Sequence, residues 1–175
     1  ALGLAALPIL RRMGTEGMLF TMALTVGLLA FLLVDTLAEG LELASEAAGA
    51  YQTDVLIWVI AALTFAALMA AGRIGARGRP TTGAYLALWM AIGIGLHNFG
   101  EGLSIGAALT LGNAALGSLL IVGFTVHNLT EGIAIAAPLT KRTPSIAVLV
   151  GLAALAGLPA VGGTMIGAFA VLPHW

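Results

Sequence analysis

Long apolar runs separated by short polar connections dominate the chain. A helix crosses the roughly 30 Å hydrocarbon core of a bilayer in about 20 apolar residues. Five runs reach that length, and they cover approximately residues 17–42, 54–72, 83–111, 114–140 and 145–171. The pattern therefore predicts an all-α fold, a polytopic membrane helix bundle with five full spans.

A further apolar segment, residues 1–10, is long enough for only half a bilayer. It lacks the basic start that is typical of a signal peptide. We expect it to be the end of a sixth span whose beginning is absent. Residues 1–175 are then expected to form a single transmembrane domain.

The amino-acid composition agrees with a membrane protein and excludes several other classes of protein. Of the 175 residues, 60% are hydrophobic and only 9% are charged, against about 25% charged in a soluble domain. A net charge of -1 without any basic tract provides no surface for nucleic acid. The chain has no cysteine, so any metal must be bound by nitrogen and oxygen atoms.

The basic residues are sorted to one side of the predicted bundle. All seven lie in alternate connections: Arg11, Arg12, Arg73, Arg77, Arg79, Lys141 and Arg142. The positive-inside rule makes these connections cytoplasmic, which predicts a multi-pass protein of the cell (inner) membrane.

Acidic residues gather at the opposite end of the first full span. Asp35 and Glu39 lie one helical turn apart on the same side of that span. They are candidates for a cation entrance, because carboxylates inside a span are costly unless they serve a pathway. The alternative is that such charges merely solvate a helix end.

The most informative feature is an internal repeat. The segment His97-Asn98-Phe99-Gly100-Glu101-Gly102 returns 30 residues later as His127-Asn128-Leu129-Thr130-Glu131-Gly132. Histidine and glutamate are four residues apart in each copy, so both side chains lie on one face of a helix.

The repeat also predicts that its two copies meet. Leu111-Gly112-Asn113 is expected to be the turn of an antiparallel hairpin, and His97 and His127 are each 15 residues from Gly112. Both imidazoles then lie roughly 22 Å from the turn, inside the hydrocarbon layer.

A divalent cation explains why such polar groups are present. Each glutamate at the membrane centre costs about 2.5 to 3.5 kcal/mol. Two carboxylates would neutralise a divalent ion, and two imidazoles would complete a four-coordinate site for Zn²⁺, with Cd²⁺, Fe²⁺ and Mn²⁺ as alternatives. Asn98 and Asn128 each lie three residues before a glutamate and could join these carboxylates in a second site.

Two other interpretations remain open. Polar side chains can simply bond one membrane helix to another. A site with three ligands and a water could also serve an intramembrane metal hydrolase. No further buried acid or nucleophile stands beside the motifs, and both glutamates are already used as ligands, so we do not expect an enzyme.

At these residues the sequence resembles the ZIP (Zrt-, Irt-like) family of divalent metal transporters. The paired His-Asn-x-x-Glu-Gly motifs are similar to those on that family's fourth and fifth helices. The resemblance implies that residues 1–10 end helix 1, that the five spans are helices 2 to 6, and that helices 7 and 8 are absent. It implies a binuclear centre with His97, Glu101, His127 and Glu131 in the primary site, and Asn98 and Asn128 in the secondary one. It further implies metal uptake by an elevator-like movement; association into a homodimer is left open.

Two departures from the family pattern affect this expectation. Gly100 and Thr130 stand where relatives often carry proline, so a kink must come from glycine flexibility or from the threonine hydroxyl. Ala160 lies where many relatives have a carboxylate. We therefore expect a strong primary site and a weak or empty secondary site. Close helix packing is also expected, at the paired glycines Gly102, Gly106, Gly163 and Gly167.

Overall fold

The computed structural model describes residues 2–46, 53–75, 82–112 and 114–170, and within these ranges it is helical with short turns and no strand. The elements are η1 (Leu2–Ala6), α1 (Leu7–Leu10), α2 (Thr15–Glu46), α3 (Thr53–Gly75), α4 (Gly83–Thr110), α5 (Ala114–Ala136), η2 (Ala137–Leu139) and α6 (Ile146–Ala170). The predicted all-α class is confirmed for the described part of the chain.

Three helical segments are long and apolar enough to cross a membrane. They are Val55–Gly75, Ala114–Leu139 and Ile146–Phe169. The chain is thus of the membrane type that its composition predicts. The count of five spans stays a prediction; α4 has the length, with 28 residues, but carries the polar first copy of the repeat.

Several predicted helix boundaries differ from those in the structure. The predicted span 114–140 leaves α-helical geometry at η2, because Pro138 has no N–H with which to continue the helix. Helix α2 begins two residues before the predicted start and extends to Glu46. Residues 2–10 form η1 and the single turn α1 in place of one continuous helix.

The described residues fall into two compact units. The first comprises residues 1–25 and 82–175, and the second comprises residues 26–81. The second unit consists of most of α2 together with α3, and the backbone of Asp35 and Glu39 lies in its α2 segment. The prediction of one transmembrane domain stays a prediction.

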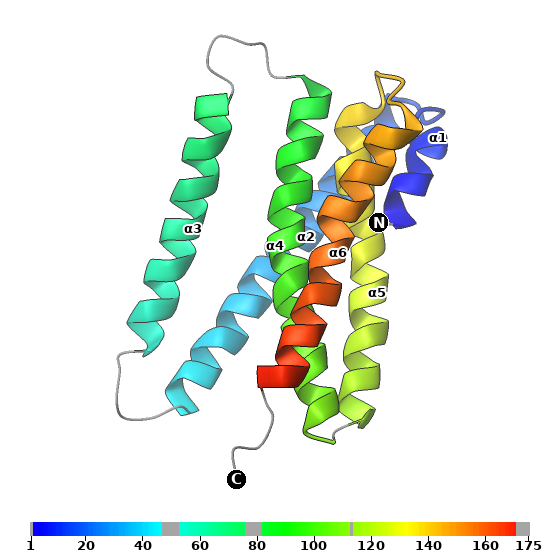
Figure 1. Cartoon of the computed structure of the whole chain (residues 1–175). Coiled ribbons are helices and arrows are strands. Elements are labelled where there is room, and N and C mark those ends of the chain that lie inside the picture. The colour runs from blue at the N-terminus through cyan, green and yellow to red at the C-terminus, as the bar shows by residue number, and fades with distance from the viewer. Residues whose placement is uncertain (1, 47–52, 76–81, 113, 171–175) are drawn as a thin grey trace. The chain divides into compact units, whose positions relative to one another are not determined.

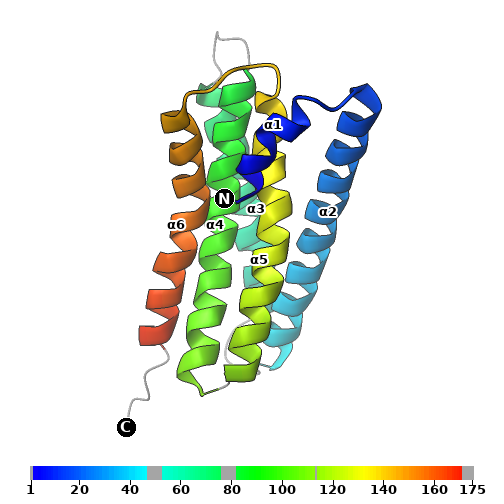
Figure 2. The ribbon, with the colours of Figure 1, turned by 90° about the vertical axis from the view of Figure 1, so that its right-hand side faces the viewer.

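Within the first unit, α4 packs along both α5 and α6, as Figures 1 and 2 show. Helix α4 joins α5 through the turn at Leu111 and Gly112, so the two form the predicted antiparallel hairpin. Gly112 has a φ of 74°, a left-handed conformation that favours glycine. The hairpin sets the relative depth of the two repeat copies.

The apolar core of this unit lies toward the end that carries α1. Its buried members come from η1, α1, α4, α5, η2 and α6, and they are Leu4, Leu7, Leu10, Ala87, Ala91, Ile94, Ile135, Ala136, Leu139, Leu152 and Ala156. Alanine provides four of them, all on long helices, which allows the helices to approach closely. This core holds the hairpin against α6 and η1.

Glycines bring α4 and α6 into backbone contact. A Cβ atom at Gly102 would meet the carbonyl of Ala160, and one at Gly163 would meet the carbonyl of Phe99. Gly106 and Gly167 make similar approaches to the facing helix. The predicted close packing at these four glycines is confirmed, while a sliding movement stays a prediction.

Candidate metal centre

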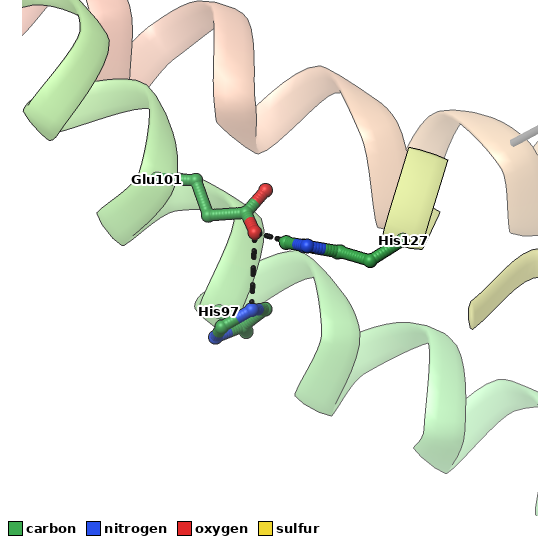
Figure 3. Close-up of side chains that lie close together, drawn as sticks. All are labelled: His97, Glu101 and His127. Carbon is green, nitrogen blue, oxygen red and sulfur yellow. Dashed lines mark ion pairs between the residues drawn. The ribbon is translucent and has the colours of Figure 1, made fainter. Parts of the chain in front are cut away.

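The hairpin of α4 and α5 brings the two histidine–glutamate pairs together. His97 Nε2 lies 3.2 Å from Glu101 Oε1, and the same oxygen forms an ion pair with His127 Nε2 (Figure 3). One ligand atom from each of these three residues lies within 4.8 Å of the other two. Glu101 is therefore the centre of the cluster and joins both copies of the repeat.

Glu131 lies at the edge of this cluster. Its Oε1 atom is 3.8 Å from His97 Nε2, and its side chain is only 2% exposed. The structure therefore groups three of the four predicted primary ligands closely and places the fourth next to His97.

Each of these four residues has a buried side-chain atom without a hydrogen bond, as do Trp89 and Asn98 among the described residues. Nε2 of His97, Nε2 of His127, Oε1 of Glu101 and Oε2 of Glu131 are all buried without a hydrogen bond, although both nitrogens lie within ion-pair distance of Glu101 Oε1. An unsatisfied buried polar group costs about 1–3 kcal/mol, and more if it is charged. Two imidazole nitrogens and two carboxylate oxygens form a donor set that suits Zn²⁺ and related cations. The residues thus fit a divalent metal ion.

The asparagines behave differently, because they bond to one another. Asn98 Nδ2 donates to Asn128 Oδ1 at 2.8 Å and to the carbonyl of Ala156 at 2.9 Å. Asn128 Nδ2 donates to Glu101 Oε2 at 3.1 Å and to the carbonyl of Phe124 at 2.7 Å. Asn128 therefore fixes the orientation of the central carboxylate, a role that its amide nitrogen performs without any metal.

Neighbours of the repeat that sequence analysis did not identify also shape the site. The Phe124 ring lies 5.4 Å from the His127 ring, and the two imidazole rings lie 5.9 Å apart. Phe124 precedes His127 by three residues, so helical spacing could have indicated this contact. The Ala156 carbonyl gives no such signal, because its position depends on how α6 packs against α4.

Thr130 and Gly100 occupy the same place in the two copies. Thr130 Oγ1 donates to the carbonyl of His127 at 2.6 Å, which is the back-bonding expected in place of proline. A Cβ atom at Gly100 would meet nothing within 4 Å. The two copies thus differ locally, with a bonded hydroxyl in one and free space in the other.

A cavity of about 270 Å³ lies beside the cluster, on its side toward the α4–α5 turn. Asn98, Glu101, Asn128 and Ala160 line it, together with apolar side chains that include Ile105. The Ala160 side chain offers no ligand atom there, and the expectation of a weak or empty secondary site stays a prediction. Pro159, the neighbouring residue, lies inside α6 near Gly95.

The candidate entrance residues cannot be placed against this cluster. The side chains of Asp35 and Glu39 lie outside the described residues. Their role as an entrance therefore stays a prediction.

Helices of this length and a partly buried histidine–glutamate cluster define the class as a membrane protein with a candidate metal centre. Comparison of the chain with protein-family models, with curated proteins and with solved structures finds no match. The resemblance to the ZIP family stays a prediction that rests on the paired motifs.

Proposed function

We propose that this protein transports divalent transition-metal cations across a membrane, with Zn²⁺ as the principal substrate and the cytoplasm as the destination. The observation that carries the proposal is the gathering of ligand atoms from His97, Glu101 and His127 within 4.8 Å of one another, with the buried carboxylate of Glu131 beside His97. A bound cation would give each of these ligand atoms a coordination partner. Two carboxylates would balance its charge.

The geometry of the cluster favours a metal over a purely structural role. Asn98 and Asn128 join the two helices directly, because Asn98 Nδ2 donates to Asn128 Oδ1. The histidines of the same two segments instead direct both imidazole nitrogens at one oxygen of Glu101, and Oε2 of Glu131 is buried without a hydrogen bond. Such a gathering of nitrogen and oxygen ligand atoms favours a bound cation over simple helix association.

The surroundings favour transport over hydrolysis. Thr125 supplies the one hydroxyl group among the described residues that line the cavity, and it donates to the carbonyl of Ile121 at 2.6 Å. A hydrolase would need a base or a nucleophile in addition to the metal ligands. Glu101 lines the cavity beside the cluster, and we expect a cation to reach it from the turn side, which is the predicted outer face.

Uptake of radioactive zinc into vesicles that contain the purified protein tests the proposal. Saturable uptake is expected for the wild type and for Ser104→Ala, an exposed change on α4. It should be lost in Glu101→Ala and in Glu131→Ala, because each removes one of the two charges that neutralise the ion. Normal uptake in either glutamate variant would overturn the proposal, and metal-dependent lipid or peptide hydrolysis without uptake would indicate an enzyme.

A further inference from the structure

Basic side chains line a cavity at the end of the first unit that carries α1. The cavity has a volume of about 640 Å³, and Arg11, Lys141 and Arg142 lie in its wall. Leu139 and Val148 contribute apolar surface to the same wall. Residues from opposite ends of the chain thus form one concave, cationic site.

The positive charge of this cavity is not balanced by carboxylates. None of the described residues that line it is acidic, and no described carboxylate forms an ion pair with its three cations. The Arg11 guanidinium donates to the main-chain carbonyl of Arg142, which ties the two segments together. Three clustered cations beside apolar surface are suited to a phosphate group, which accepts hydrogen bonds from arginine and lysine.

An apolar groove begins at the same cations. A second cavity, of about 490 Å³, shares Arg11 and Lys141 with the first. Its remaining wall is largely formed by apolar side chains of α1, the following loop and the start of α2, including Met13, Met18 and Met22. Methionine side chains adapt readily to a flexible hydrocarbon chain. The two cavities together offer a charged compartment that continues into an apolar one.

We propose that an anionic phospholipid binds here, with its phosphate at Arg11, Lys141 and Arg142 and an acyl chain in the methionine-lined groove. Free phosphate has the same charge chemistry, but it would leave the adjoining groove unused. Basic sites on membrane proteins recognise anionic headgroups near the cytoplasmic surface, the side to which positive-inside sorting assigns these residues. The inference is independent of metal transport.

Native mass spectrometry of the full chain, released from detergent, provides the test. The probes are phosphatidylglycerol, phosphatidylcholine with matched acyl chains, and inorganic phosphate. Phosphatidylglycerol should be retained in preference to phosphatidylcholine, and inorganic phosphate should not displace it. Equal retention of the two lipids would overturn the proposal.

Variants separate the charged compartment from the groove. Arg11→Gln/Lys141→Gln/Arg142→Gln should weaken phosphatidylglycerol retention roughly 100-fold, at about fivefold for each cation removed. Arg12→Gln, which removes a neighbouring charge outside the cavity wall, is the matched control and should change it little. Lys141→Gln alone keeps the Arg11 contact intact and should still show a loss of about fivefold.

Met22→Trp fills the groove, and Leu24→Trp is its control on the same helix, because Leu24 does not line the groove. Weaker lipid retention in Met22→Trp alone supports the proposal. If Met22→Trp retains the lipid normally, or if inorganic phosphate competes with it in the wild type, the site is one for free phosphate and the lipid assignment is wrong.

Discussion

The two copies of the repeat have nearly the same sequence but different surroundings. In the α4 copy, Glu101 contacts both histidines and accepts a hydrogen bond from Asn128. In the α5 copy, the ion pair that Glu131 forms among the described residues is with His97 alone, at 3.8 Å. The same motif therefore has a different role in each helix, because the residues packed around each helix determine which carboxylate lies at the centre of the cluster.

The packing partners of the two copies explain the asymmetry. Gly102, which ends the α4 copy, lies against the backbone of α6, whereas Gly132 lies against Gly3 of η1. A long helix supports one copy and a short 3-10 segment supports the other. The α4 copy is therefore the more firmly held of the two.

The largest expected effect separates the two glutamates. Glu101→Gln should weaken zinc binding by at least about 100-fold, since even groups that only orient a ligand are worth about 10–100-fold. Glu131→Gln should cost less, because Glu131 lies at the edge of the cluster. Isothermal titration of the purified variants with Zn²⁺ measures both. Equal losses would show that the asymmetry disappears when metal binds.

A second prediction concerns the glycines of the α4 copy. Gly102→Ala should destabilise the fold by about 1–3 kcal/mol, because the new methyl group meets the carbonyl of Ala160 in α6. Gly100→Ala is the control; its Cβ atom meets nothing, and it should stabilise the helix by about 0.5–1 kcal/mol. Unfolding in a denaturing detergent gives both values. A neutral Gly102→Ala would mean that α4 and α6 are not in backbone contact.

A third, smaller effect is expected from the asparagines. The double variant Asn98→Ala/Asn128→Ala should still bind one zinc ion per chain, with an affinity reduced by about tenfold, because Glu101 loses the amide that orients it. Elemental analysis after dialysis gives the stoichiometry. Two tightly bound ions that persist in this variant would contradict the expectation of a weak secondary site.

The smallest expected effect concerns Thr130, which has no counterpart in the α4 copy. Thr130→Ala removes the hydroxyl bond to the His127 carbonyl and should change unfolding by about 1 kcal/mol or less. Zinc affinity should be almost unchanged. A large loss of affinity would show that this bond positions the His127 ring, and Thr130→Ser should then restore it.

Much of the site follows from helical geometry alone. The repeat, the equal distances to Gly112 and the rise per residue predict that His97 and His127 meet, and the structure places their rings 5.9 Å apart. Those quantities do not determine how α6 lies against the hairpin. The role of the Ala156 carbonyl and the offset of Glu131 depend on that tertiary packing and could not be derived from spacing.

The helical class was equally accessible from the sequence, because long apolar runs leave few alternatives to membrane helices. The exact ends of the helices were harder to predict from the sequence. Residues 1–10 read as one continuous apolar helix, yet Gly3 lies against Gly132 within a 3-10 segment. This close backbone contact requires a glycine in each of two segments that are far apart in the sequence. Neither glycine predicts the contact by itself.

X-ray absorption at the zinc edge, combined with zinc content per chain, tests the metal centre most directly. The purified protein loaded with one equivalent of Zn²⁺ should show a first shell of nitrogen and oxygen atoms at about 2.0–2.2 Å, with the scattering pattern of two imidazole rings. His97→Ala/His127→Ala should lose both the zinc and that pattern. Zinc that stays bound in this double variant with an unchanged spectrum would contradict the assignment of the site.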